Sequence, residues 1–123
     1  VLLHMPADKN DLNWLRMQDN RKRLEAAKDA RGNKLEIIEV PQPQRNLKRG
    51  DGRRLSTSYV NFYIANGGIV MPSFDDPNDD VAAKIIADAF PDRKVVQVPS
   101  LDIAAGGGVI HCITQQQPAG VPL

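Results

Sequence analysis

Near the end of the chain lies the sequence Gly106-Gly107-Gly108-Val109-Ile110-His111-Cys112-Ile113-Thr114-Gln115-Gln116-Gln117-Pro118, which contains its only cysteine. Consecutive glycines let a backbone come close to a ligand, because no Cβ stands in the way. The short apolar run after them predicts a strand over residues 109–114 that carries Cys112. A cysteine behind a glycine loop is a candidate nucleophile, although a free cysteine without further context is more often a small buried apolar residue.

The rest of the chain alternates strand and helix signals. Asn66-Gly67 predicts a hairpin, because both turn positions of the favoured two-residue loop need a positive φ. The second helix is predicted to have Asp76 as its N-cap and Pro77 as its first residue, and Gly32 suits the left-handed residue after the first helix. The predicted elements are strands at 1–5, 34–40, 58–65, 69–74 and 94–98, and helices at 12–30 and 77–90.

These elements form an internal repeat. Met5-Pro6 and Met71-Pro72 each begin a polar turn, a helix and a strand that ends at a proline. A further strand is predicted after each copy, at 58–65 and at 109–114. The chain therefore contains two copies of a strand–helix–strand–strand unit, a periodicity typical of propellers and arrays.

Between the two copies, residues 42–55 are predicted to form a loop rich in positive charge. The charge indicates either a contact with nucleic acid or phosphate, or a solvated, mobile loop. No aromatic residue lies between the charges, as a stacking platform for bases would need, and this favours the solvated loop. The basic residues are Arg45, Lys48, Arg49, Arg53 and Arg54.

Composition narrows the possible functions. With 123 residues, 41% hydrophobic and 25% charged, the chain is one soluble domain or part of one. The net charge of +1 gives no electrostatic reason to expect binding to nucleic acid or to an anionic membrane. No apolar run is as long as a membrane span, and the first residues do not look like a signal peptide. A single cysteine cannot form an internal disulfide, so we expect a cytoplasmic protein. Because Val1 falls within a predicted strand, we also expect the parent gene product to begin upstream.

Several stretches resemble the agmatine deiminases of bacteria and plants. The resemblance covers nearly the whole chain and is loosest in the basic loop. The stretch from Gly106 to Pro118 is its longest and most specific part. The others are Tyr59-Val60-Asn61-Phe62-Tyr63-Ile64-Ala65-Asn66-Gly67, Phe90-Pro91-Asp92-Arg93-Lys94-Val95-Val96, and the segment from Leu24-Glu25-Ala26-Ala27 to Arg31-Gly32.

The resemblance implies a fold that agrees with the repeat. Agmatine deiminases belong to the guanidine-modifying pentein superfamily, whose fold is a five-bladed α/β propeller built from ββαβ blades. We therefore expect an α/β chain, a partial pentein-type propeller of about two ββαβ units in a single partial domain at 1–123. Unit one covers about 1–65 and unit two about 66–118. Open sheet edges in such a structure predict self-association into a homo-oligomer.

The resemblance also implies a reaction and a nucleophile. Agmatine deiminases hydrolyse agmatine to N-carbamoylputrescine and ammonia, a step toward putrescine, without a metal or an organic cofactor. Cys112 matches the family nucleophile, whose thiolate attacks the guanidinium carbon and forms a covalent thiouronium intermediate. The histidine and aspartate that assist it lie upstream in a Gly-His-x-Asp-Asn motif, which residues 1–123 do not contain.

Other residues are candidates for the same site. His111 adjoins Cys112 on the predicted strand, so it should point to the opposite face and pack against a helix. His4 is interpreted as structural, and Asp102 precedes the glycine loop and could reach the cysteine. The residues predicted to contact a small guanidinium substrate are Gly107, Gly108 and Asn61.

Two functions from different classes remain open at this point. One is an enzyme, the C-terminal portion of an agmatine deiminase. The other is a truncated, catalytically inactive descendant that acts as an oligomeric binding module for guanidinium or polyamine ligands. A nucleic-acid binder that uses the basic loop is a third and less favoured possibility, and neither nucleic acid nor a membrane is an expected partner.

Overall fold

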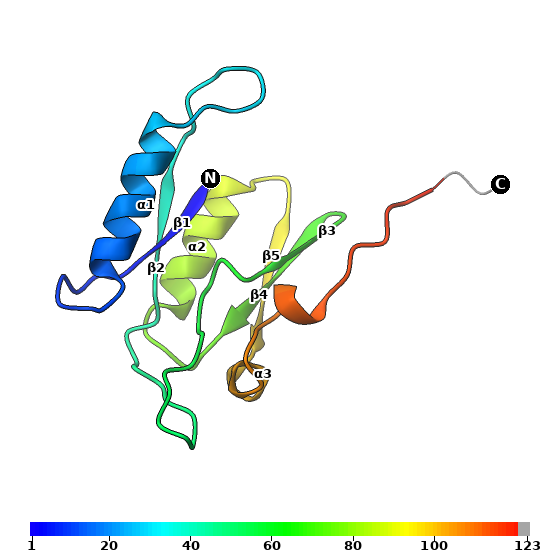
Figure 1. Ribbon diagram of the computed structural model, residues 1–123. Helices are drawn as coiled ribbons and strands as arrows, with labels where there is room; N and C mark the ends of the chain where they lie inside the picture. Colours follow the sequence, from blue (N-terminus) through cyan, green and yellow to red (C-terminus); the bar gives the residue numbers. More distant parts are fainter. Residues whose placement is uncertain (121–123) are drawn as a thin grey trace.

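The computed structural model describes residues 1–120 (Figure 1). No helix in that range is both long enough and apolar enough to cross a lipid bilayer. The elements in chain order are β1 (Leu2–Met5), α1 (Trp14–Ala26), β2 (Ile38–Pro41), β3 (Tyr63–Ala65), β4 (Gly68–Ser73), α2 (Asp79–Ala89), β5 (Lys94–Pro99), α3 (Leu101–Ala105) and the 3-10 helix η1 (His111–Ile113).

The strands form two sheets. β1 pairs with β2 in parallel, whereas β4 pairs in parallel with β5 and antiparallel with β3. A helix joins the two strands of each parallel pair, so the chain contains the units β1-α1-β2 and β4-α2-β5. This confirms the α/β class and the strand–helix–strand part of the predicted repeat. Within residues 1–120 the two sheets do not close into a ring, and the division of the chain near residue 65 stays a prediction.

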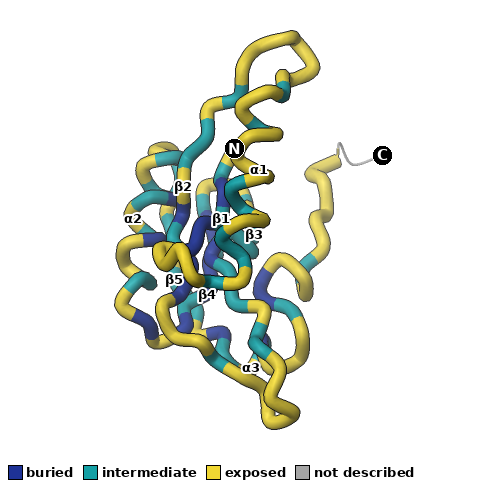
Figure 2. The backbone as a smooth tube through the Cα atoms, turned by 60° about the vertical axis from the view of Figure 1, so that its left-hand side comes forward, coloured by how far each residue is buried: buried dark blue, intermediate teal, exposed yellow. Residues whose placement is uncertain are grey.

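Helix α2 lies between the two sheets, where it contacts both β2 and β5 (Figure 1). Helix α1 covers the other side of the two-stranded sheet and packs mainly on β1. The buried apolar residues lie mainly on β1, β2, β4 and α2, and in the segment that follows β5 (Figure 2). The core cluster consists of Val40, Tyr59, Ile69, Met71, Phe74, Ala82, Ile86, Ala104 and Val109.

Helix α1 is shorter than predicted and ends at Ala26 instead of residue 30. The carboxylate of Asp29 accepts hydrogen bonds from the backbone N–H groups of Arg31 and Asn33, and such local bonds compete with helix formation. Gly32 has the expected positive φ of 82°, but it lies in this turn and not directly after the helix. β2 then begins at Ile38, four residues later than predicted.

Helix α2 begins at Asp79, later than the predicted start at Pro77. Asp76 does not cap the helix. Its carboxylate accepts the N–H of Asn78 within the preceding turn. Asp79 and Asp80 do occupy the first turn, where negative charge is favoured by the helix dipole. Of the apolar residues that recur at helical spacing on this helix, Ala82 and Ile86 are fully buried, whereas Val81 is 49% exposed.

The hairpin at Asn66-Gly67 is confirmed, since Ala65 of β3 pairs with Gly68 of β4. Of its two turn residues, only Gly67 has a positive φ. Gly67 has a φ of 74°, whereas the single non-glycine residue with positive φ in the described part of the chain is Asp75. β3 covers only Tyr63–Ala65 of the strand predicted at 58–65, because the chain makes a turn at Ser58 in which its carbonyl accepts the N–H of Asn61.

The predicted strand at 109–114 is wrong. His111–Ile113 form the 3-10 helix η1, which Thr114 closes with a backbone N–H bond of 3.2 Å to the carbonyl of His111. The preceding helix α3 was not predicted either. The apolar run after the glycines therefore buries Val109 and Ile110 and then turns at η1 instead of continuing as a strand.

Candidate functional site around Cys112

Cys112 lies in η1 and is exposed. Its Sγ accepts a hydrogen bond from the side-chain Nδ2 of Asn61, at 3.0 Å. The two residues are 51 positions apart in the sequence, and the fold brings them together where the chain passes from the turn at Ser58 toward β3. Of the predicted site residues, Asn61 is thus the one with a direct polar contact to the cysteine sulfur.

The other end of the Asn61 amide explains the local shape of the cysteine segment. Asn61 Oδ1 accepts the backbone N–H groups of His111 at 2.8 Å and of Cys112 at 3.3 Å. The backbone carbonyl of Asn61 also accepts the N–H of His111, at 3.1 Å. A strand would direct these N–H groups to a neighbouring strand. Here one side chain accepts both, and the segment forms η1 instead.

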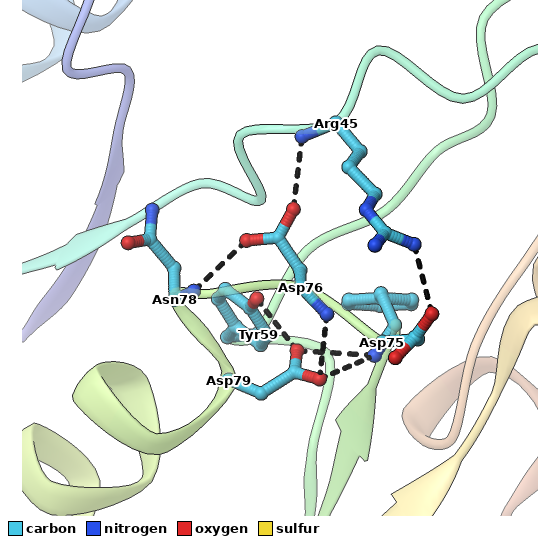
Figure 3. Close-up of polar contacts among 7 residues, drawn as sticks. Arg45, Tyr59, Asp75, Asp76, Asn78 and Asp79 are labelled. Carbon is cyan, nitrogen blue, oxygen red and sulfur yellow. Dashed lines mark hydrogen bonds and ion pairs between the residues drawn. The ribbon is translucent and has the colours of Figure 1, made fainter.

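The turn that carries Asn61 is anchored by Tyr59, whose side chain is fully buried. The Tyr59 hydroxyl donates a hydrogen bond of 2.7 Å to the Asp79 carboxylate at the start of α2 (Figure 3). Asp79 also accepts the backbone N–H groups of Phe74 and Asp76. Burial, followed by the bond to Asp79, raises the pKa of Tyr59, so the hydroxyl keeps its proton and remains a donor. No local sequence signal links Tyr59 to Asp79, which is why the contact was not predicted.

The glycines before the cysteine have two separate roles. Gly107 has a φ of 106°, a conformation that residues with a side chain rarely adopt. A Cβ on Gly108 would lie 2.7 Å from the Cβ of Cys112 and 3.2 Å from its Sγ. The absence of a side chain at 108 therefore makes room for the cysteine itself, and the predicted contacts of both glycines with substrate stay a prediction.

The surroundings of the thiol favour its ionised form. The side-chain amide of Asn61, together with the backbone N–H of Val109, holds the pKa of the Cys112 thiol below its ordinary value. Both groups are neutral hydrogen-bond donors, and each is stronger toward a thiolate than toward a thiol. An exposed sulfur with a lowered pKa is the state in which a cysteine acts as a nucleophile.

The chain also matches a known protein family. The model of the Porphyromonas-type peptidyl-arginine deiminases matches residues 1–118. The chain belongs to this deiminase family. The agmatine deiminase of Ectopseudomonas mendocina (strain ymp) is 44% identical over an alignment of 135 residues, which covers 97% of this chain and 37% of the relative. The chain thus spans little more than a third of the length of that curated relative.

Solved structures of deiminases share the fold. The agmatine deiminase of Enterococcus faecalis superposes with a TM-score of 0.89 at 31% identity, over 95% of this chain and 36% of that one. A cysteine-to-serine variant of the C. jejuni agmatine deiminase with substrate bound gives a TM-score of 0.86 at 26% identity, over 98% of this chain and 34% of that one.

The histidines of this deiminase-family chain lie in contrasting surroundings. His111 is exposed, so the prediction that it packs against a helix is wrong, and it fails because η1 replaces the strand whose alternation it assumed. His4 is partly buried, with Nε2 3.3 Å from Gln42 Oε1 and Nδ1 3.2 Å from Ser58 Oγ. Its two ring nitrogens thus join β1 to Gln42 at the start of the basic loop and to Ser58 just after the loop, which agrees with its structural interpretation.

The predicted approach of Asp102 to the cysteine is not observed. Asp102 lines a pocket of about 770 Å³ whose lining residues do not include Cys112. The pocket lies beyond the carboxyl ends of β4 and β5 and is rich in carboxylates. Arg45 of the basic loop also lines it and forms a 2.8 Å ion pair with Asp75. Within residues 1–120, no group of three or more His, Cys, Asp or Glu side chains is placed to hold a metal ion.

Proposed function

We propose that this chain supplies the nucleophile of an agmatine deiminase, which hydrolyses agmatine to N-carbamoylputrescine and ammonia. The observation that carries the proposal is the exposed Cys112 Sγ held at 3.0 Å by the Asn61 amide, in a chain of the deiminase family. Its support for agmatine, and not another guanidine, is the likeness to relatives and solved structures named agmatine deiminase.

The chemistry requires an activated sulfur, because delocalised charge makes a guanidinium carbon a poor electrophile. In the proposed reaction the Cys112 thiolate forms a bond to that carbon, and the C–N bond to a terminal amine breaks. The amine takes a proton and leaves as ammonia, and the carbon stays attached to sulfur as a thiouronium. Water then adds to the same carbon and the C–S bond breaks, which releases the ureido product and restores the thiol.

The proton transfers need a general acid–base that we assign to a part of the protein outside residues 1–123. Of the two histidines, His4 is hydrogen-bonded to Gln42 and Ser58, and His111 is adjacent to Cys112 in the same 3-10 turn, so we assign the role to neither. We propose that the histidine and carboxylates come from further blades of a pentein propeller, to which this chain contributes two α/β units. In the absence of those blades, the open edges of its two sheets favour self-association.

Release of ammonia tests the proposal. Because the proposed acid–base lies outside residues 1–123, the full-length protein that contains this chain is incubated with agmatine. Ammonia and N-carbamoylputrescine are measured, with arginine and a peptidyl-arginine as comparison substrates. We expect activity to prefer agmatine and to fall to background in Cys112→Ala, while Asn20→Asp on the exposed side of α1 leaves it unchanged. Turnover that survives in Cys112→Ala would contradict the role of the cysteine, and a preference for peptidyl-arginine would contradict the substrate.

A second candidate function is favoured by one observation, the pocket of about 770 Å³ beyond β4 and β5, whose carboxylates suit a guanidinium or a polyamine. In this case the chain would bind guanidinium or polyamine ligands as an oligomer without turning them over. Binding of agmatine to the full-length protein in calorimetry, combined with no ammonia release and a multimeric mass in light scattering, would favour this function over the enzyme.

A further inference from the structure

We propose that Asn61 is a positioning residue, whose side-chain amide holds the Cys112 sulfur and the backbone of η1 in one fixed arrangement. The inference rests on the proposed role of Cys112 as the nucleophile. It assigns Asn61 a different task from the substrate contact predicted from the sequence.

Asn61 uses both ends of its amide group on the cysteine segment. Nδ2 donates to Sγ at 3.0 Å, while Oδ1 accepts the N–H groups of His111 and Cys112 at 2.8 and 3.3 Å. The orientation of the amide follows from this pattern, because the reverse orientation would direct an NH₂ group at two backbone donors. The sulfur therefore faces a donor and not a carbonyl oxygen.

The same contacts leave Asn61 poorly suited to bind a guanidinium. A guanidinium carries only hydrogen-bond donors, so a residue that binds it must offer a free acceptor. A carbonyl oxygen has two lone pairs, and the two backbone N–H groups of η1 occupy both on Oδ1. The backbone carbonyl of Asn61 is likewise engaged by His111. The acceptors of Asn61 thus serve the backbone that carries the nucleophile.

No other residue type can make these contacts from position 61. Aspartate has the acceptors but lacks the donor, alanine lacks both, and glutamine is one methylene longer. The position itself is fixed by its neighbours, since the Asn61 N–H bonds to the Ser58 carbonyl and Tyr59 is buried against Asp79. The amide is therefore pre-organised toward the sulfur before any ligand arrives.

Two variants separate the two ends of the amide. Asn61→Asp keeps an acceptor for the η1 backbone but replaces the donor to Sγ with a negatively charged oxygen. Asn61→Ala removes both ends. Asn20→Asp adds the same charge on the exposed surface of α1 and serves as the matched control. Circular dichroism and urea unfolding show which variants remain folded.

The readout is the rate at which iodoacetamide alkylates Cys112, measured from about pH 5 to pH 10 by intact-protein mass. Because the thiolate is the reacting form, the pH profile reports the thiol pKa. We expect Asn61→Asp to raise that pKa and to slow alkylation near neutral pH about tenfold, the effect of one pKa unit. Asn61→Ala should raise it less, and Asn20→Asp should match wild type. A folded Asn61→Asp protein with the wild-type profile would overturn the proposal.

A measurement on the wild-type protein covers the case in which the variants do not fold. The side-chain NH₂ resonances of Asn61, followed by NMR through the titration of Cys112, should shift with the same midpoint as the alkylation profile. Resonances that do not respond to the thiol titration would overturn the proposal. Neither readout needs agmatine or the proposed acid–base, so a full-length protein that passes both but releases no ammonia would contradict the proposed function and leave the role of Asn61 intact.

Discussion

Helices α1 and α2 occupy the same place in two strand–helix–strand units, yet they are buried to different extents. α2 buries Ala82 and Ile86 completely, whereas α1 has no buried residue and leaves Leu15 78% exposed. The contrast is visible in Figure 2, where α1 is mainly exposed. The difference comes from the neighbours, because α2 has a sheet on each side and α1 has only one.

The second unit, β4-α2-β5, holds the residues that anchor the turn next to Cys112. The loop before α2 and the helix's first residue, Asp79, hold Tyr59, and Tyr59 fixes the turn from which Asn61 reaches Cys112. The unit β1-α1-β2 contributes Val40 of β2 to the core cluster, and no residue of its helix α1 belongs to that cluster. Substitutions in equivalent places should therefore have unequal effects in the two units.

The largest difference is expected between Ile86→Ala in α2 and Leu15→Ala in α1. Ile86 is fully buried, so its truncation removes apolar contacts and leaves a cavity that should cost about 3 kcal/mol of unfolding free energy. Leu15 is exposed, and its truncation should change the same quantity by less than about 0.5 kcal/mol. Urea unfolding measures both. Equal losses in the two variants would show that α1 is covered in solution, for instance by a second copy of the chain.

The hydroxyl of Tyr59 should account for the next largest effect. Tyr59→Phe keeps the buried ring but removes a hydrogen bond to the Asp79 carboxylate, and bonds to charged groups contribute about 2 kcal/mol. Tyr63→Phe is the matched control, because the Tyr63 hydroxyl makes no hydrogen bond to another residue in the range 1–120. Thermal unfolding compares the pair. If both variants melt at the wild-type temperature, the Tyr59–Asp79 contact does not stabilise the turn that carries Asn61.

A smaller effect is expected from Gly108→Ala, whose new methyl group would lie 2.7 Å from the Cys112 Cβ. The cysteine must move, and its sulfur should lose the bond to Asn61, at a cost of about 1 kcal/mol because the site is exposed and can relax. Gly50→Ala is the control, since an added Cβ there meets no atom within 4 Å. Alkylation of Cys112 at neutral pH should slow in the first variant and not in the second, and an unchanged rate in both would mean that the sulfur has room to move.

The sequence was sufficient for features that depend on neighbours in the chain. The buried stripe of α2 follows from apolar residues at helical spacing, and the hairpin follows from Asn66-Gly67. The candidate nucleophile, Cys112, was found because family members share the whole stretch around it. In each case the decisive residues lie within about one turn or one loop of each other.

Features that depend on distant side chains were not predicted. Cys112 was placed on a strand because nothing near it in the sequence shows that Asn61, 51 residues away, takes up the N–H groups of His111 and Cys112. The burial of His111 failed for the same reason, since it was inferred from strand alternation. Similarly, Asp76 resembled a helix cap, although the helix begins three residues later at Asp79, whose carboxylate bonds back to Phe74 and Asp76.

The two histidines also differ in their surroundings, and this difference predicts the smallest effect, a change in the pH dependence of stability. Burial, opposed by the hydrogen bond that His4 donates to Gln42 Oε1 and assisted by the charge of Arg54, lowers the pKa of His4 below its ordinary value of 6.5. Below pH 6.5 the unfolded chain therefore binds more protons than the folded one, so stability is full above that pH and is lost as the pH falls through the folded pKa. Urea unfolding between about pH 7 and pH 5 should show this loss in wild type and in His111→Gln, and a flatter profile in His4→Gln. A wild-type stability that rises toward pH 5 would contradict the lowered pKa and, with it, the role of His4 as a neutral link between Gln42 and Ser58.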